Sequence, residues 1–93
     1  MTTRIKTIEK KLIEWINLAE KQYEEKIDIK YDIDRANKII NIYYDGTAYK
    51  IINYYFSDGY NLFGLGEKFD NLLDNTSFSM ERETNSHITF YQD

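Results

Sequence analysis

Residues 40–49, INIYYDGTAY, carry the local signal on which the expected fold depends most. Asp45-Gly46 lies between β-type residues there, and Asp-Gly is the strongest short-range hairpin signal because both central residues of a type I′ turn need positive φ. The pattern predicts a hairpin that pairs residues 38–44 with residues 47–56. Its tyrosines would then occupy both faces of the sheet, so the core could not bury them all.

An amphipathic helix is predicted before this hairpin. From Ile5 to Ile27 the apolar residues recur at steps of three and four, which makes one stripe of a helix. Thr2 or Thr3 is expected as the N-cap. Trp15 lies within the stripe, which favours a core anchor over a ligand-binding side chain.

After the helix, apolar and charged residues alternate strictly, and this pattern predicts a first strand near residues 28–33. The apolar members of the alternation should face the core, and Asp28, Asp32 and Asp34 should face solvent. These three aspartates lack the closely spaced glycine and distal glutamate of a calcium loop. We therefore expect a solvated acidic face and no metal site.

The C-terminal third predicts a short helix and a second hairpin. Phe69, Leu72 and Leu73 have a helical spacing near residues 67–74. Residues 77–83 should pair with residues 87–91 around a three-residue loop, because that loop puts the apolar side chains of both strands on one face. Gly64 and Gly66 match no nucleotide-binding motif and indicate a flexible connection.

These elements define an α+β fold in one domain, residues 1–93. We expect a long N-terminal helix packed on a four- or five-stranded antiparallel sheet, with a short helix between two hairpins. A chain of 93 residues can bury one thin core, and no apolar run approaches the roughly 20 residues that cross a bilayer.

Composition narrows the class of protein further. The chain has no cysteine, a net charge of −4 and no apolar leader at its N-terminus, so we expect a cytoplasmic protein without cofactor. Residues 1–27 hold six basic and five acidic groups, whereas residues 28–93 hold six basic and eleven acidic groups. The acidic excess beyond the helix disfavours nucleic acid as a partner and favours a basic protein surface.

The single histidine, His87, is interpreted as a surface residue. Glu81 or Glu83 could approach it across the second hairpin, but general acid–base catalysis also needs a pocket and a positioned substrate. The sequence supplies no nucleophile for His87 to activate. We therefore expect no enzyme.

Nine tyrosines and the acidic residues beyond the helix give the candidate binding surface. Tyrosine offers a large contact area at a low entropic cost and is enriched at protein interfaces, although strands also favour it. The candidate partner-binding residues are Asp28, Asp32, Asp34, Tyr43, Asp45, Tyr54, Asp58, Tyr60, Glu67 and Asp70.

The function expected from this surface is non-catalytic protein binding. The protein would act as an inhibitor that covers a basic surface of its partner, for example a surface that binds nucleic acid. In size and charge the chain resembles the heterogeneous group of phage-encoded anti-defence proteins, including anti-CRISPRs, an analogy that no motif carries. The alternatives are an immunity protein that neutralises a toxin, a single-stranded nucleic-acid binder with exposed sheet tyrosines, and a homodimer formed through a sheet face or edge.

Overall fold

The fold is described from a computed structural model, which describes residues 2–53 and 62–93. It confirms the α+β class, with four antiparallel strands in one sheet and a short helix between two hairpins. In chain order the elements are α1 (Ile5–Tyr23), β1 (Ile29–Asp34), β2 (Ile39–Tyr44), α2 (Gly46–Asn53), the 3₁₀ turn η1 (Leu62–Gly64), α3 (Leu65–Asp70), β3 (Phe78–Thr84) and β4 (His87–Gln92).

Helix α1 packs the predicted stripe against the sheet. Ile8, Leu12, Trp15 and Ala19 are buried, and the helix ends where Glu24 adopts a left-handed conformation. The expected threonine N-cap is wrong, because Arg4 occupies that position without a side-chain hydrogen bond. Thr3 instead exchanges two hydrogen bonds with Ser77, which ties the N-terminus to the start of β3.

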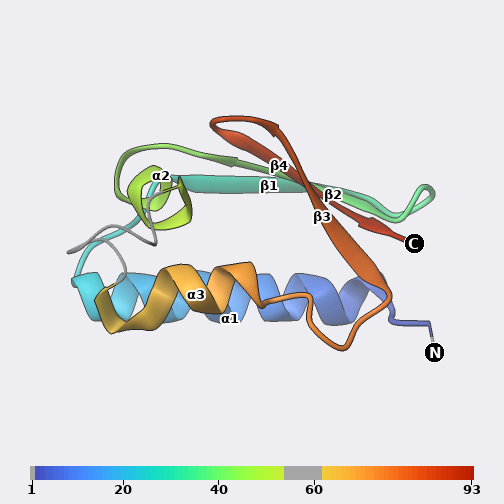
Figure 1. The fold of residues 1–93 in the computed structure, drawn as a ribbon, viewed down its shortest axis with the longest axis horizontal. Helices are drawn as coiled ribbons and strands as arrows, with labels where there is room; N and C mark the ends of the chain where they lie inside the picture. Colours follow the sequence, from blue (N-terminus) through green and yellow to red (C-terminus); the bar gives the residue numbers. More distant parts are fainter. Residues whose placement is uncertain (1, 54–61) are drawn as a thin grey trace.

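The sheet has the strand order β1-β2-β4-β3, so the two hairpins meet along their inner strands β2 and β4. Ile40 lies opposite Phe90, and Ile42 lies opposite Ile88. Figure 1 shows α1 and α3 together on one side of this sheet. We call that side the inner face and the opposite side the outer face.

The hairpin predicted around Asp45-Gly46 is wrong. Residues 46–53 form helix α2, in which the amide of Tyr49 bonds to the carbonyl of Asp45, and residues 54–56 of the predicted strand lie outside the described residues. Gly46 does have the positive φ that the signal implied, at 56°, but it begins a helix. The reason is the spacing of the buried side chains Ala48, Ile51 and Ile52, which a helix gathers on one face and a strand would divide between two.

The first hairpin instead joins β1 to β2 through residues 35–38. Asp34 lies opposite Ile39, and its carboxylate accepts hydrogen bonds from the backbone and side-chain amides of Asn37. Lys38 adopts a positive φ of 56° before β2 begins. This is the side-chain-stabilised turn that aspartate and asparagine favour.

The second hairpin is confirmed, with a different turn from the expected one. Met80 lies opposite Phe90 and Arg82 opposite Ile88, so the apolar residues share the inner face as predicted. A register shift between Arg82 and Thr84 supplies the extra residue that we expected in the loop. The preceding helix α3 is shorter than predicted, and Leu72 and Leu73 are buried in the turns after it.

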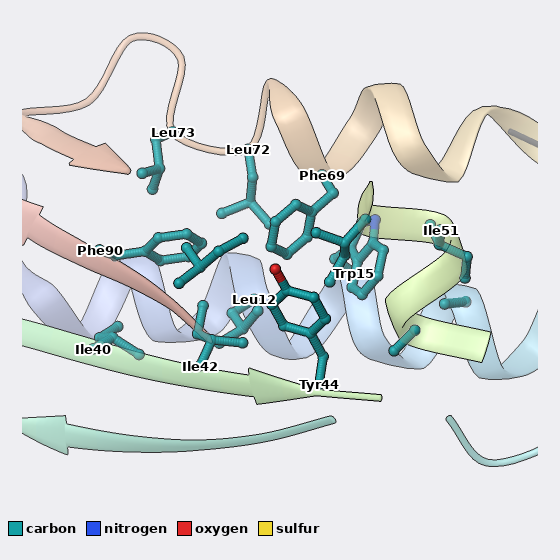
Figure 2. Packing of buried hydrophobic residues seen from close by; sticks show 14 of the residues in the cluster. Leu12, Trp15, Ile40, Ile42, Tyr44, Ile51, Phe69, Leu72, Leu73 and Phe90 are labelled. Atoms are coloured by element: carbon teal, nitrogen blue, oxygen red, sulfur yellow. The ribbon is translucent and has the colours of Figure 1, made fainter. Parts of the chain in front are cut away.

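The core lies between the inner face and the helices. Figure 2 shows side chains of α1, α2, α3, β2 and β4 meeting there. Trp15 is 4% exposed, donates its indole N–H to the carbonyl of Leu65 over 3.0 Å, and meets Phe69 edge to face, which confirms it as a core anchor. Among the described residues, the search for a helix able to span a membrane finds none.

Candidate functional site

The outer face of the sheet carries three rows of side chains that cross the strands. The register puts Lys30, Tyr43 and His87 in one row. The next row holds Asp32, Asn41, Thr89 and Glu81. The third holds Asp34, Ile39, Tyr91 and Ser79. This face is therefore polar, with carboxylates at both sides of the sheet and aromatic rings near its middle.

Asn41 is the centre of a hydrogen-bond network on this face. Its amide nitrogen donates to Asp32 Oδ1 over 3.2 Å, and its Oδ1 lies 3.0 Å from His87 Nε2 and 3.3 Å from Thr89 Oγ1. An ionised carboxylate only accepts hydrogen bonds, so the bond to Asp32 fixes which end of the amide is nitrogen. His87 Nε2 must then carry the proton that it donates to Asn41.

Tyr43 is the exposed aromatic ring of the face. Its ring stacks on the His87 imidazole, with centroids 4.4 Å apart and planes 20° apart, while 45% of the residue remains exposed. Because Asn41 holds His87, the ring of Tyr43 rests on a fixed support. A ring that is already ordered loses little conformational entropy when a partner covers it.

A shallow cavity of about 260 Å³ lies beside this ring. Asp28, Lys30, Tyr43, Asp45 and Ser86 are among its lining residues. The amide of Asp45 donates to the carbonyl of Asp28 over 2.9 Å, which joins the two backbones at the ends of β1 and β2. Three of the predicted partner-binding residues, Asp28, Tyr43 and Asp45, are thus brought together.

The other predicted residues lie apart from this cavity. Asp32 and Asp34 belong to the outer face, and the Asn37 hydrogen bonds lower the pKa of the Asp34 carboxyl. Glu67 and Asp70 lie on α3, in the helical layer on the other side of the sheet. Tyr54, Asp58 and Tyr60 lie outside the described residues.

The described tyrosines do not form one continuous exposed patch. Tyr44 is 3% exposed and belongs to the core, where Arg82 Nη1 donates to its hydroxyl over 2.9 Å. Burial raises the pKa of Tyr44, and the neighbouring Arg82 guanidinium opposes that shift. The other described tyrosines apart from Tyr43 are half-buried.

Sequence reasoning did not include Asn41, Thr89 or Tyr91 among the candidate partner-binding residues. The hydrogen-bond partners of Asn41 on β4 lie 46 and 48 residues away in the chain, and no local pattern shows that β2 and β4 are neighbours. The predicted pairing of residues 77–83 with residues 87–91 puts the apolar side chains on one face and so leaves His87, Thr89 and Tyr91 on the other, and the structure confirms this placement.

The contacts of His87 on this face involve an amide and a phenol. Nε2 of His87 lies within hydrogen-bonding distance of the Asn41 side-chain oxygen, and the imidazole ring stacks on the ring of Tyr43. Within the described ranges, no group of three or more histidine, aspartate or glutamate side chains is positioned to hold a metal ion. Searches against protein-family models, curated proteins and solved structures find no match for the chain.

Proposed function

We propose that this protein is a small acidic, non-catalytic binding module that lays the outer face of its sheet on a basic surface of a partner protein and inhibits the partner by covering that surface. The observation that carries the proposal is Tyr43, a 45% exposed ring stacked on His87 and bordered by Asp28 and Asp45. An ordered aromatic ring beside carboxylates suits a surface rich in arginine and lysine.

Electrostatics support a basic protein over other partners. The rows of the outer face hold three carboxylates, Asp32, Asp34 and Glu81, against the ammonium of Lys30. Single-stranded nucleic acid would also stack on Tyr43, but it needs a cationic track for its phosphates. The carboxylates of Asp28 and Asp45, which line the cavity beside Tyr43, would repel those phosphates instead.

The protein would act by occlusion, because covering a nucleic-acid-binding surface requires no chemistry from the inhibitor. This is the mode expected of a phage anti-defence protein such as an anti-CRISPR, and an immunity protein would cover a toxin in the same way. The identity of the captured partner would distinguish an anti-defence protein from an immunity protein. A homodimer formed through a sheet face or edge is the other partner expected from the sequence.

The test is capture from a cell extract on the immobilised protein, followed by stepwise elution with salt. Asp28→Asn with Asp45→Asn removes two charges beside Tyr43, and Glu67→Gln with Asp70→Asn removes two charges from α3 as the matched control. We expect the wild type and the control variant to retain basic partners, and the variant with Asp28→Asn and Asp45→Asn to lose them. Rising salt should elute the retained partners.

A Tyr43→Ala variant isolates the contribution of the aromatic ring. A central interface aromatic costs about 2 kcal/mol or more when truncated, so partner retention should fall at least about 30-fold. Equal capture by all variants, or elution that does not depend on salt, would rule out the outer face as the binding surface. Retention of a labelled single-stranded oligonucleotide at low salt would show that the partner is nucleic acid and not a protein.

A further inference from the structure

Arg82 is a cation of the inner face that has no carboxylate partner in the described part of the chain. It lies on β3 opposite the buried Ile88, and its guanidinium reaches Asn53 at the end of α2. The ion pair found among the described residues joins Arg35 to Glu9 instead. The positive charge of Arg82 is therefore available to an anion from outside the chain.

Two neutral side chains hold this guanidinium in place. Its Nη1 donates to the hydroxyl of Tyr44 over 2.9 Å and also to Oδ1 of Asn53. Tyr44 is buried, and Nδ2 of Asn53 donates to the carbonyl of Asn85 over 2.7 Å, so both partners are themselves fixed. A side chain that is already ordered loses little conformational entropy when a ligand binds it.

The remaining donors of the guanidinium suit a planar anion. Arginine has five N–H donors, and the bonds to Tyr44 and Asn53 use only those of Nη1. The donors of Nε and Nη2 have no partner in the described chain. Two guanidinium N–H groups donate in parallel to the two oxygens of a carboxylate, which is the geometry that arginine favours.

A cavity beside Arg82 has room for the organic part of such an anion. Its volume is about 340 Å³, and Tyr49, Asn53, Arg82 and Asn85 are among its lining residues. Ligand cavities measure roughly 300–1,000 Å³, so this one fits a small molecule. The ring of Tyr49 lies beside that of Tyr44, with centroids 6.3 Å apart, and supplies an aromatic surface to the cavity.

We propose that this cavity binds a small organic acid, whose carboxylate accepts hydrogen bonds from Nε and Nη2 of Arg82. The side-chain amide of Asn85, which makes no hydrogen bond in the described chain, is a second donor to the carboxylate. Tyr49 contacts the organic part of the acid. This site lies on the opposite side of the sheet from Tyr43 and is independent of the proposed partner surface.

Charge favours a carboxylate over a phosphate at this site. The described lining residues supply one cation, which balances the single negative charge of a carboxylate. A phosphate monoester carries about −1.5 to −2 charges at neutral pH and would need a second cation. Glu83 follows Arg82 at the register shift of β3, and its carboxylate disfavours a second negative charge further.

The first test is an NMR titration with benzoate, phenyl phosphate and benzamide, three probes with the same ring, at constant ionic strength. Benzoate should give saturable shifts of the Arg82 Nε–H and Asn85 side-chain amide signals. Phenyl phosphate should bind more weakly, and benzamide, which has no charge, should not bind. Absence of a saturable benzoate shift, or tighter binding of either other probe, would overturn the proposal.

The second test compares substitutions that remove one positive charge each. Arg82→Gln should weaken benzoate binding at least about tenfold, because it removes charged hydrogen bonds. Arg82→Lys keeps the charge and a donor for Tyr44 but loses the fork, so its affinity should lie between those of Arg82→Gln and the wild type. The control is Lys68→Gln on α3, which should not change the affinity. Equal losses for residues 68 and 82, or no loss at residue 82, would contradict a site at Arg82.

A third comparison separates this site from the proposed partner surface. Tyr43→Ala on the outer face should leave benzoate binding unchanged, and Arg82→Gln should leave capture of a basic partner unchanged. Loss of benzoate binding in Tyr43→Ala without loss in Arg82→Gln would place the acid on the outer face and overturn the proposal.

Discussion

Replacing Asn41 with alanine should lower the free energy of unfolding by about 1–2 kcal/mol and release the ring pair on the outer face. The side chain makes three hydrogen bonds, to Asp32, His87 and Thr89, and each intramolecular hydrogen bond contributes about 0.5–1.5 kcal/mol net. We take less than the full sum because Asn41 is half-buried and water would satisfy part of what is lost.

Urea unfolding followed by fluorescence of Trp15, the single tryptophan, measures this change. The control is Asn71→Ala at an exposed position after α3, which should cost under about 0.5 kcal/mol. NMR signals of the His87 ring should shift in the Asn41 variant, because Nε2 loses its acceptor. An Asn41 variant as stable as the control, with unchanged His87 signals, would refute the reasoning that this network fixes the face.

Further predictions concern the core, the start of α2 and the dependence of stability on pH. Trp15→Phe should cost about 2–3 kcal/mol, measured by urea unfolding with circular dichroism, because it removes the indole hydrogen bond to the carbonyl of Leu65 and leaves a gap in the core. Gly46→Ala should cost about 1 kcal/mol in the same assay, since the nearest atom to an added Cβ is 4.0 Å away but φ is +56°. The raised pKa of Tyr44 stabilises the fold fully below its ordinary value of 10.0, and this contribution is lost as pH rises through the higher folded pKa. Urea unfolding in a pH series should therefore show less alkaline loss for Tyr44→Phe than for the wild type. The lowered pKa of Asp34 acts in the opposite sense, so the stability difference between wild type and Asp34→Ala should shrink as pH falls below the ordinary value of 3.8.

Local periodicity was sufficient for most of the fold. The three-and-four spacing predicted α1 with Trp15 inside, and alternation predicted β1 to within a residue at each end. The Asp45-Gly46 signal correctly implied positive φ at Gly46, but φ at one residue does not decide whether a strand or a helix continues the chain. The spacing of Ala48, Ile51 and Ile52 decided it, because their burial in a helix outweighed the β-propensity of the isoleucines and tyrosines around them.

The candidate site was less predictable because it depends on the order of the strands. Alternation put Asp28 and Asp32 on the solvent side, and the structure agrees. The stack of Tyr43 on His87 arises where β2 meets β4, a contact between residues distant in the chain. Tyr44, the neighbour of Tyr43, is buried, so the tyrosine count of the sequence overstates the exposed aromatic surface.

Photo-crosslinking from the outer face tests the central claim most directly. A benzophenone amino acid introduced at position 43 should couple to the captured basic partner, and the same group at position 70 on α3 should not. Coupling at position 70 with none at position 43 would contradict the assignment of the outer face as the binding surface.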